Sequence, residues 1–217
     1  AGNGPSLKQM DLSALKNETL FVTNRFVLVD GAQNLSPSFY CLSDFGHWNT
    51  PEGFIEPLRA AFPRLTGTEF FFEYNARAAV AAHPEIFPRR PFFLFQDYFT
   101  EVRGHGLQTD VQKPVYWGRS GGLDICAPLA CYMGFSEIYL IGCDCNWGIQ
   151  TEIHNATYSY DAARDRAFYE NARERDVSYL PTASHEVMLL DAYESVKKHP
   201  PSGARIFNAG VGGRLES

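Results

Sequence analysis

The first residues of the chain form a glycine-rich turn that could bind phosphate. Gly2-Asn3-Gly4-Pro5-Ser6-Leu7 places two glycines before a proline that can start a helix. Glycine lets the backbone approach a ligand closely, and a helix start offers free N–H groups and its positive dipole end to an anion. Leu7 stands where the dinucleotide fingerprint needs a third glycine, and no Gly-Lys-Ser/Thr ending marks a P-loop. The motif alone is equally typical of a structural turn.

A second turn of small residues occurs near the middle of the chain. Ser120-Gly121-Gly122 precedes an apolar stretch that runs to Met133 and is typical of a buried helix. The sequence therefore predicts a second candidate anion site at Ser120 and Gly121.

Polar residues follow several apolar runs, at the points where strands would end. In open α/β sheets the carboxyl ends of the strands face the ligand-binding crevice. Four such endings predict one polar site along a sheet edge: Thr23-Asn24-Arg25, Ser43-Asp44, Gln96-Asp97 and Gly142-Cys143-Asp144.

These residues need a scaffold, and the chain alternates short apolar runs with helix-like stretches, the pattern of an α/β domain with a mostly parallel sheet flanked by helices. The predicted strands are Thr19–Thr23, Ser38–Ser43, Glu69–Tyr74, Pro91–Gln96, Glu137–Gly142 and Arg205–Asn208. The predicted helices are Pro51–Phe62, Asn75–Ala82, Gly121–Met133, Asp161–Arg175 and His185–Lys198. Residues 104–119 and 144–160 are predicted to be loops.

The 217 residues fit one domain, 1–217, with a small lid predicted within residues 144–183. We expect the domain to be trimmed at both ends, because a glycine turn normally follows a strand and the last residues resemble part of a loop. No apolar run is long enough to span a membrane. The net charge of −6 argues against nucleic-acid binding through phosphate contacts.

Five cysteines are distributed without a metal-binding pattern. Cys143-x-Cys145 has no second pair at zinc spacing, so no metal site is predicted. Reduced cysteines and the lack of a signal peptide predict a cytoplasmic protein. A homo-oligomer is compatible with the sequence.

Taken together, the motifs resemble a known enzyme family. Gly-Asn-Gly-Pro-Ser-Leu, the strand end with Asn24, the Ser120-Gly121 turn and Glu137-Ile-Tyr-Leu-x-Gly-x-Asp144 are similar to the bacterial sialyltransferases of glycosyltransferase family forty-two. They are equally similar to a wider group of domains related to 6-hydroxymethylpterin diphosphokinases, which the ending Phe207–Glu216 resembles best. The similarity covers most of the chain but is dense only at its start and between Ser120 and Asp161.

The sialyltransferase resemblance implies a Rossmann-like domain with a lid, a CMP-activated sugar donor and a glycan acceptor. It implies that Asn3 and the backbone of Gly2–Ser6, including Gly4, bind the nucleotide phosphate and ribose. Asn24 and Ser120 would lie near the donor, and Asp144 would contact the ribose or the network at the strand ends.

The resemblance also implies two catalytic residues. Tyr158, in Thr157-Tyr158-Ser159-Tyr160-Asp161, would donate a hydrogen bond to the departing phosphate, and His185, before a helix, would be the general base. A helix start disfavours imidazolium and so keeps the ring neutral. His154 is the alternative base. A second phosphate-binding tyrosine of the family is missing, because Asn146 occupies its position.

The sequence thus predicts an inverting glycosyltransferase that uses a CMP-activated sialic-acid-like sugar and needs no metal. One alternative is a diphosphokinase that uses ATP and Mg²⁺, with Asp44, Asp97 and Asp144 as candidate metal ligands. Another is a nucleotide-binding module without activity in a protein that acts on surface glycans.

Overall fold

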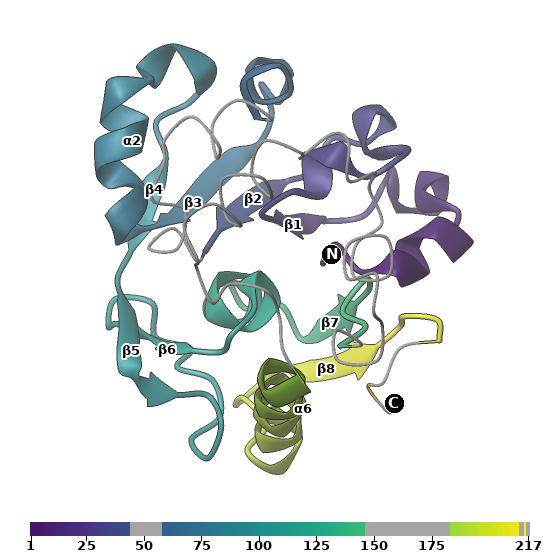
Figure 1. The fold of residues 1–217 in the computed structure, drawn as a ribbon, viewed down its shortest axis with the longest axis vertical. Coiled ribbons are helices and arrows are strands. Elements are labelled where there is room, and N and C mark those ends of the chain that lie inside the picture. Colours follow the sequence, from purple (N-terminus) through teal and green to yellow (C-terminus); the bar gives the residue numbers. More distant parts are fainter. Residues whose placement is uncertain (44–57, 146–182, 213–214, 216–217) are drawn as a thin grey trace.

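The computed structural model describes residues 1–43, 58–145, 183–212 and 215, and the side chains of residues 183–185 are outside this description (Figure 1). The strands are β1 (Phe21–Thr23), β2 (Phe39–Leu42), β3 (Glu69–Glu73), β4 (Phe92–Leu94), β5 (Gln96–Glu101), β6 (Val115–Trp117), β7 (Glu137–Leu140) and β8 (Arg205–Asn208). The α-helices are α2 (Arg77–Ala82), α3 (Ala127–Tyr132) and α6 (Ala183–Lys198). A π-helical turn, η9 (Gly122–Cys126), leads directly into α3. Short 3-10 turns are η1 (Pro5–Gln9), η2 (Leu12–Leu15), η3 (Phe26–Leu28), η4 (Ala32–Asn34), η6 (Phe62–Arg64), η7 (Tyr74–Ala76) and η8 (Pro84–Ile86).

All strand pairs of the described residues are parallel. A four-stranded sheet has the order β1-β2-β3-β4, and β5 pairs with β6 and β7 with β8. Parallel strands need crossover connections and cover on their faces, and the helices and turns between the strands, such as η7 and α2 between β3 and β4, provide the connections here. The chain is therefore an α/β protein with parallel strands, as the sequence predicts.

The amino-terminal segment lies between two of these strand groups. Gly2 N donates to Ile141 O and Gly4 N to Gly142 O, each at 2.8 Å, just after β7 ends. On the other side, the Ala1 amino group donates to Phe21 O at the start of β1. Residues 1–4 thus connect the end of β7 to β1 (Figure 1).

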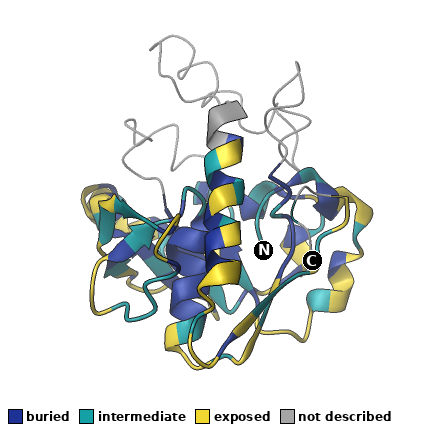
Figure 2. Cartoon of the chain, turned by 90° about the horizontal axis from the view of Figure 1, so that it is seen from below, coloured by how far each residue is buried: buried dark blue, intermediate teal, exposed yellow. Residues whose placement is uncertain are grey.

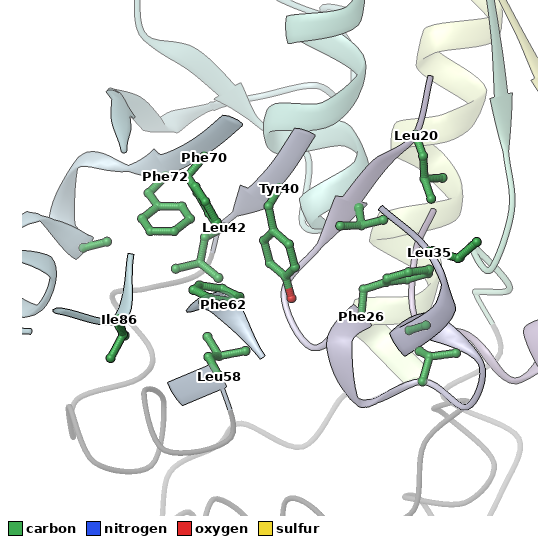
Figure 3. Packing of buried hydrophobic residues seen from close by; sticks show 14 of the residues in the cluster. Leu20, Phe26, Leu35, Tyr40, Leu42, Leu58, Phe62, Phe70, Phe72 and Ile86 are labelled. Carbon is green, nitrogen blue, oxygen red and sulfur yellow. The ribbon is translucent and has the colours of Figure 1, made fainter. Parts of the chain in front are cut away.

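Alternating strand residues bury two faces of the four-stranded sheet. One face is a core built around Tyr40, Phe62, Phe70 and Phe72, all essentially inaccessible to solvent (Figure 3). The rings of Tyr40 and Phe62 meet edge to face with centroids 4.7 Å apart. The opposite face packs Cys41 and its neighbours against η9 and α3, which fixes the turn at residues 120–122 beside the strand ends.

Helix α6 buries one side and exposes the other (Figure 2). Glu186, Leu189, Ala192 and Val196 are buried, at the three- and four-residue spacing of an amphipathic helix. Leu189, Ala192 and Val196 pack with Leu123 of η9, so α6 lies beside the second glycine turn.

The structure differs from the sequence-based expectations in four places. Gln96-Asp97, expected to end a strand, instead begins β5, because β4 already ends at Leu94. Residues 104–119 are not all loop, because Val115–Trp117 forms β6; three residues are too few to show a period. β5 was not predicted, since Gln96–Glu101 is rich in polar residues. The helix expected after Pro5 is only the five-residue 3-10 turn η1. The predicted helix Asp161–Arg175 and most of the predicted lid and of Pro51–Phe62 lie outside the described residues.

Candidate functional site

Asp144 holds the first glycine turn in place. Its two carboxylate oxygens accept hydrogen bonds from Ser6, one from the backbone N at 2.6 Å and one from Oγ at 2.5 Å. Gly4 fits against the same carboxylate, because a methyl group there would lie 2.6 Å from Asp144 Oδ2 and 2.8 Å from Gly142 O. Asp144 is 6% exposed. The N–H of Ser6, expected to be free for phosphate, is therefore committed to Asp144.

The second glycine turn packs directly on the ends of β1 and β2. A methyl group at Gly121 would lie 1.8 Å from Thr23 Oγ1 and 3.1 Å from Ser43 Oγ. Only glycine leaves room for this approach. The turn also organises the start of η9, since Ser120 O accepts from Asp124 N at 2.7 Å.

Asn24 connects the ends of β1 and β2 in a left-handed conformation, with φ of 48°. Its side-chain oxygen accepts from Ser43 N at 3.1 Å, and its backbone N donates to Cys41 O at 3.0 Å. The Tyr40 hydroxyl donates to Asn24 O at 2.5 Å. The side-chain oxygen of Asn24 is therefore already bonded. The predicted contact between Asn24 and the sugar donor would have to use the side-chain amide nitrogen.

Cys143 joins the two turns. A methyl group at Gly2 would lie 3.3 Å from Cys143 Sγ, and one at Gly122 would lie 3.8 Å from it and 3.6 Å from the Tyr193 hydroxyl. Tyr193 comes from α6 and hydrogen-bonds both Cys143 and Ser120. Burial raises the pKa of Tyr193 well above its usual value, and the Cys143 and Cys145 sulfurs raise it further. Burial likewise raises the pKa of the Cys143 thiol, so both groups keep their protons near neutral pH.

Three buried polar atoms beside these turns have no hydrogen-bond partner in the described structure: Asn3 Oδ1, Thr23 Oγ1 and Ser43 Oγ. Thr23 is 4% exposed and Ser43 is fully buried. Ala1 hydrogen-bonds Phe21, so their two segments are neighbours there. Asn3 follows Ala1 by two residues, and Thr23 follows Phe21 by two residues. Buried polar groups are rarely left unpaired, because each costs about 1–3 kcal/mol.

The structure brings together most of the predicted binding residues. Gly2, Asn3, Gly4, Ser6 and Asp144 form one part of the site, and Asn24, Ser120 and Gly121 form the other, with Cys143 between them. His185 lies in the first turn of α6, but its side chain is outside the described residues. Tyr158, His154 and Asn146 also lie outside them, so the catalytic assignments stay predictions.

The carboxylates considered for Mg²⁺ are not gathered where the structure describes them. Asp97 Oδ1 accepts from Phe99 N and Thr100 N in its own turn, while Asp144 is engaged by Ser6. Asp44 is outside the described residues. Over the described ranges, no three His, Cys, Asp or Glu residues form a group suited to a metal ion.

Sequence reasoning did not anticipate Tyr193 or the central position of Cys143. Tyr193 lies on the predicted helix His185–Lys198, two turns after the candidate base, but no local pattern indicates that it reaches Ser120. Thr23 and Ser43 were within the predicted polar strand ends, although the pattern did not show that their hydroxyls would lack partners.

Comparisons of the chain with the profiles of known protein families, with curated proteins and with solved structures found no match. The resemblance to sialyltransferases and to pterin diphosphokinases therefore stays a prediction from motifs. None of the helices in the described part of the chain has the length and apolar character to cross a bilayer.

Proposed function

We propose that this chain is a glycosyltransferase whose candidate site binds a CMP-activated sugar of the sialic-acid or related nonulosonic type, on a Rossmann-like α/β fold. The observation that carries the proposal is the set of three unpartnered polar atoms, Asn3 Oδ1, Thr23 Oγ1 and Ser43 Oγ, beside two glycine turns. Thr23 ends β1, Ser43 directly follows β2 and Asn3 lies beside the end of β7, and α/β proteins bind nucleotides at the carboxyl ends of parallel strands.

The three atoms suit the polar parts of a nucleotide. The Thr23 and Ser43 hydroxyls can donate to phosphate or ribose oxygens, and Asn3 Oδ1 can accept from a ribose hydroxyl. Asp144 supports this arrangement indirectly, because it fixes Ser6 and thereby the backbone that follows Gly4. The contacts of Tyr193 with Ser120 and Cys143 hold the second turn in place, as Asp144 holds the first.

The proposed reaction is a single displacement with inversion at the anomeric carbon. The bond from that carbon to the CMP phosphate oxygen breaks, and CMP leaves with the electron pair. The acceptor hydroxyl oxygen of a glycan forms the new bond, and its proton passes to His185. Tyr158 donates a hydrogen bond to the departing phosphate, which stabilises its developing charge. This scheme needs no metal ion.

The test is thermal unfolding of the purified chain with CMP, and separately with ATP and Mg²⁺, for the wild type and two threonine variants. Thr23 and Thr68 are both buried, but Thr68 Oγ1 donates to Pro37 O at 2.6 Å whereas Thr23 Oγ1 has no partner among the described residues. We expect Thr23→Val to leave the free protein about as stable as before and to lose stabilisation by CMP. Thr68→Val should lower the free energy of unfolding by about 1–2 kcal/mol and should keep the stabilisation by CMP.

Each other result changes the proposal in a defined way. Stabilisation by ATP with Mg²⁺ but not by CMP would replace the proposal with the diphosphokinase alternative. No stabilisation by either ligand would favour a module without nucleotide chemistry. Equal stabilisation of the wild type and Thr23→Val by CMP would place the nucleotide elsewhere.

A further inference from the structure

A second group of unpartnered polar atoms lies on β5 and β6, next to the candidate site along the chain. Tyr98 of β5 meets Trp117 of β6 edge to face, with ring centroids 5.8 Å apart. Gln96 precedes Tyr98 by two residues and pairs with Val115, two residues before Trp117. On β6, Val115 and Trp117 share a face, so Gln96 lies on the face of Trp117, diagonally across the two strands, although the register on β5 shifts between Asp97 and Glu101. Arg119 follows β6 directly and precedes Ser120 of the second glycine turn.

Arg119 is held firmly by two contacts. Its guanidinium lies 3.9 Å from the centre of the Trp117 ring, and its Nη2 is 2.5 Å from Glu101 Oε1. Its side chain is only 13% exposed and its φ is 61°, a left-handed conformation that few arginines adopt. A backbone in this region persists only where its surroundings fix it, often at a functional site.

Four polar atoms of this group are buried without a hydrogen-bond partner in the part of the chain that the structure describes. They are Gln96 Nε2, Gln96 Oε1, Trp117 Nε1 and Arg119 Nε. Both ends of one amide, an indole N–H and a guanidinium N–H are an unusual set to leave unpaired on neighbouring residues of two paired strands. A partner from outside the described chain would satisfy them.

The four atoms define the chemistry of that partner. Three are N–H donors and one, Gln96 Oε1, is an acceptor. Donors from indole and guanidinium suit an oxyanion, and the acceptor suits a hydroxyl group next to it. We infer that Gln96, Trp117 and Arg119 form a subsite for an oxyanion that carries an adjacent hydroxyl, such as the carboxylate end of a sugar acid. This deepens the proposed function and rests on it for the class of sugar, because the proposed donor sugar is itself an acid, but it does not depend on the nucleotide.

The experiment measures the melting temperature of the chain with glucuronate, with glucose and with inorganic phosphate, each at the same ionic strength. Glucuronate and glucose differ in the carboxylate, and phosphate lacks the carbon-bound hydroxyls. We expect glucuronate at about ten times its dissociation constant to raise the melting temperature by about 3 °C, and glucose to leave it unchanged.

Two variants and one control tie the effect to these atoms. Gln96→Leu removes two unpartnered atoms, and Trp117→Phe removes one while keeping a ring beneath Arg119. Gln112→Leu is the control, because Gln112 is exposed and hydrogen-bonds Tyr132. We expect Gln96→Leu to be at least as stable as the wild type without ligand, and Trp117→Phe to be less stable because it loses part of the ring that packs on Tyr98 and Arg119. Both variants should lose the glucuronate shift, and the control should keep it.

The outcomes separate this inference from the nucleotide proposal. A glucuronate shift that survives in Gln96→Leu, or no shift with any anion, would overturn the subsite and leave buried water as the partner. A shift with phosphate alone would overturn the hydroxyl part of the assignment. CMP stabilisation is measured on the same variants, and its retention in Gln96→Leu would show that the nucleotide site is intact.

Discussion

The two glycine turns of the candidate site are built in different ways. In the first turn, the N–H groups of Gly2, Gly4 and Ser6 donate to Ile141 O, Gly142 O and Asp144. In the second turn, Gly121 lies against Thr23 and Ser43, whose hydroxyls have no partner among the described residues. The N–H groups of Gly2, Gly4 and Ser6 in the first turn are therefore bonded within the protein, while the second turn lies against two buried hydroxyls that have no partner among the described residues.

This difference assigns different tasks to similar motifs. A glycine turn whose N–H groups are already bonded positions its neighbours and has little left to offer a phosphate. A turn that brings two unpartnered hydroxyls together is a better place to bind a polar ligand. The sequence treats both turns as anion sites, but hydrogen bonding distinguishes a support from a binding surface.

The largest expected effect comes from crowding the second turn. Gly121→Ala would place a methyl group 1.8 Å from Thr23 Oγ1 and 3.0 Å from its Cβ, so β1 and the turn must separate. We expect a loss of about 3 kcal/mol in the free energy of unfolding, measured by urea denaturation, or failure to fold.

Two further variants make this result specific. Gly67→Ala is the control, because no atom lies within 4 Å of the position of its added methyl group, and it should change stability little. Thr23→Ala combined with Gly121→Ala should recover part of the loss, because it removes the closest atom. If the double variant were as unstable as Gly121→Ala, the packing described here would be wrong.

The second prediction concerns the first turn. In Asp144→Asn, only one side-chain oxygen remains to accept from Ser6 N or Ser6 Oγ, and the NH₂ group faces the Ser6 group that is left without an acceptor. The residue is only 6% exposed, so water cannot easily replace the lost bond. We expect a cost of about 2 kcal/mol in urea denaturation. Asp97→Asn is the control, since Asp97 uses a single oxygen, Oδ1, in a local turn that asparagine also forms. Similar losses for both variants would remove Asp144 from its role as support.

Much of the scaffold follows from the sequence because its signals are local. Six predicted strands occur close to their predicted positions, since apolar runs end at turns and polar residues there. β8 matches the predicted bounds Arg205–Asn208. β5 could not be predicted from an apolar run, because its residues Gln96–Glu101 are mostly polar and half-buried.

The site itself depends on contacts between distant residues. Ser6 and Asp144 are 138 residues apart, and no periodicity in either segment indicates that they bond. Motif resemblance grouped them and placed Asp144 either at the nucleotide ribose or in the network at the strand ends, but it did not indicate that the carboxylate bonds Ser6 of the turn. The partners of Thr23, Ser43 and Gln96 are likewise properties of the folded chain, because burial and geometry decide which polar atoms stay unpaired.

The smallest predicted effect is a pH dependence at Cys143, where the two turns meet. Burial raises the pKa of this thiol above its usual 9.0, so the folded chain retains the proton to higher pH than the unfolded chain. The retained thiol proton therefore stabilises the folded chain fully below pH 9, and this stabilisation is lost as pH rises through the folded-state pKa, at less than about 1.4 kcal/mol per pH unit.

The free energy of unfolding should therefore decrease above pH 9 more steeply for the wild type than for Cys143→Ala. Some slope should remain in the variant, because the pKa of Tyr193 is raised by burial in the same direction. Identical slopes would mean that the Cys143 thiol is open to solvent, and the two turns would then be less closely joined than their contacts with Cys143 indicate.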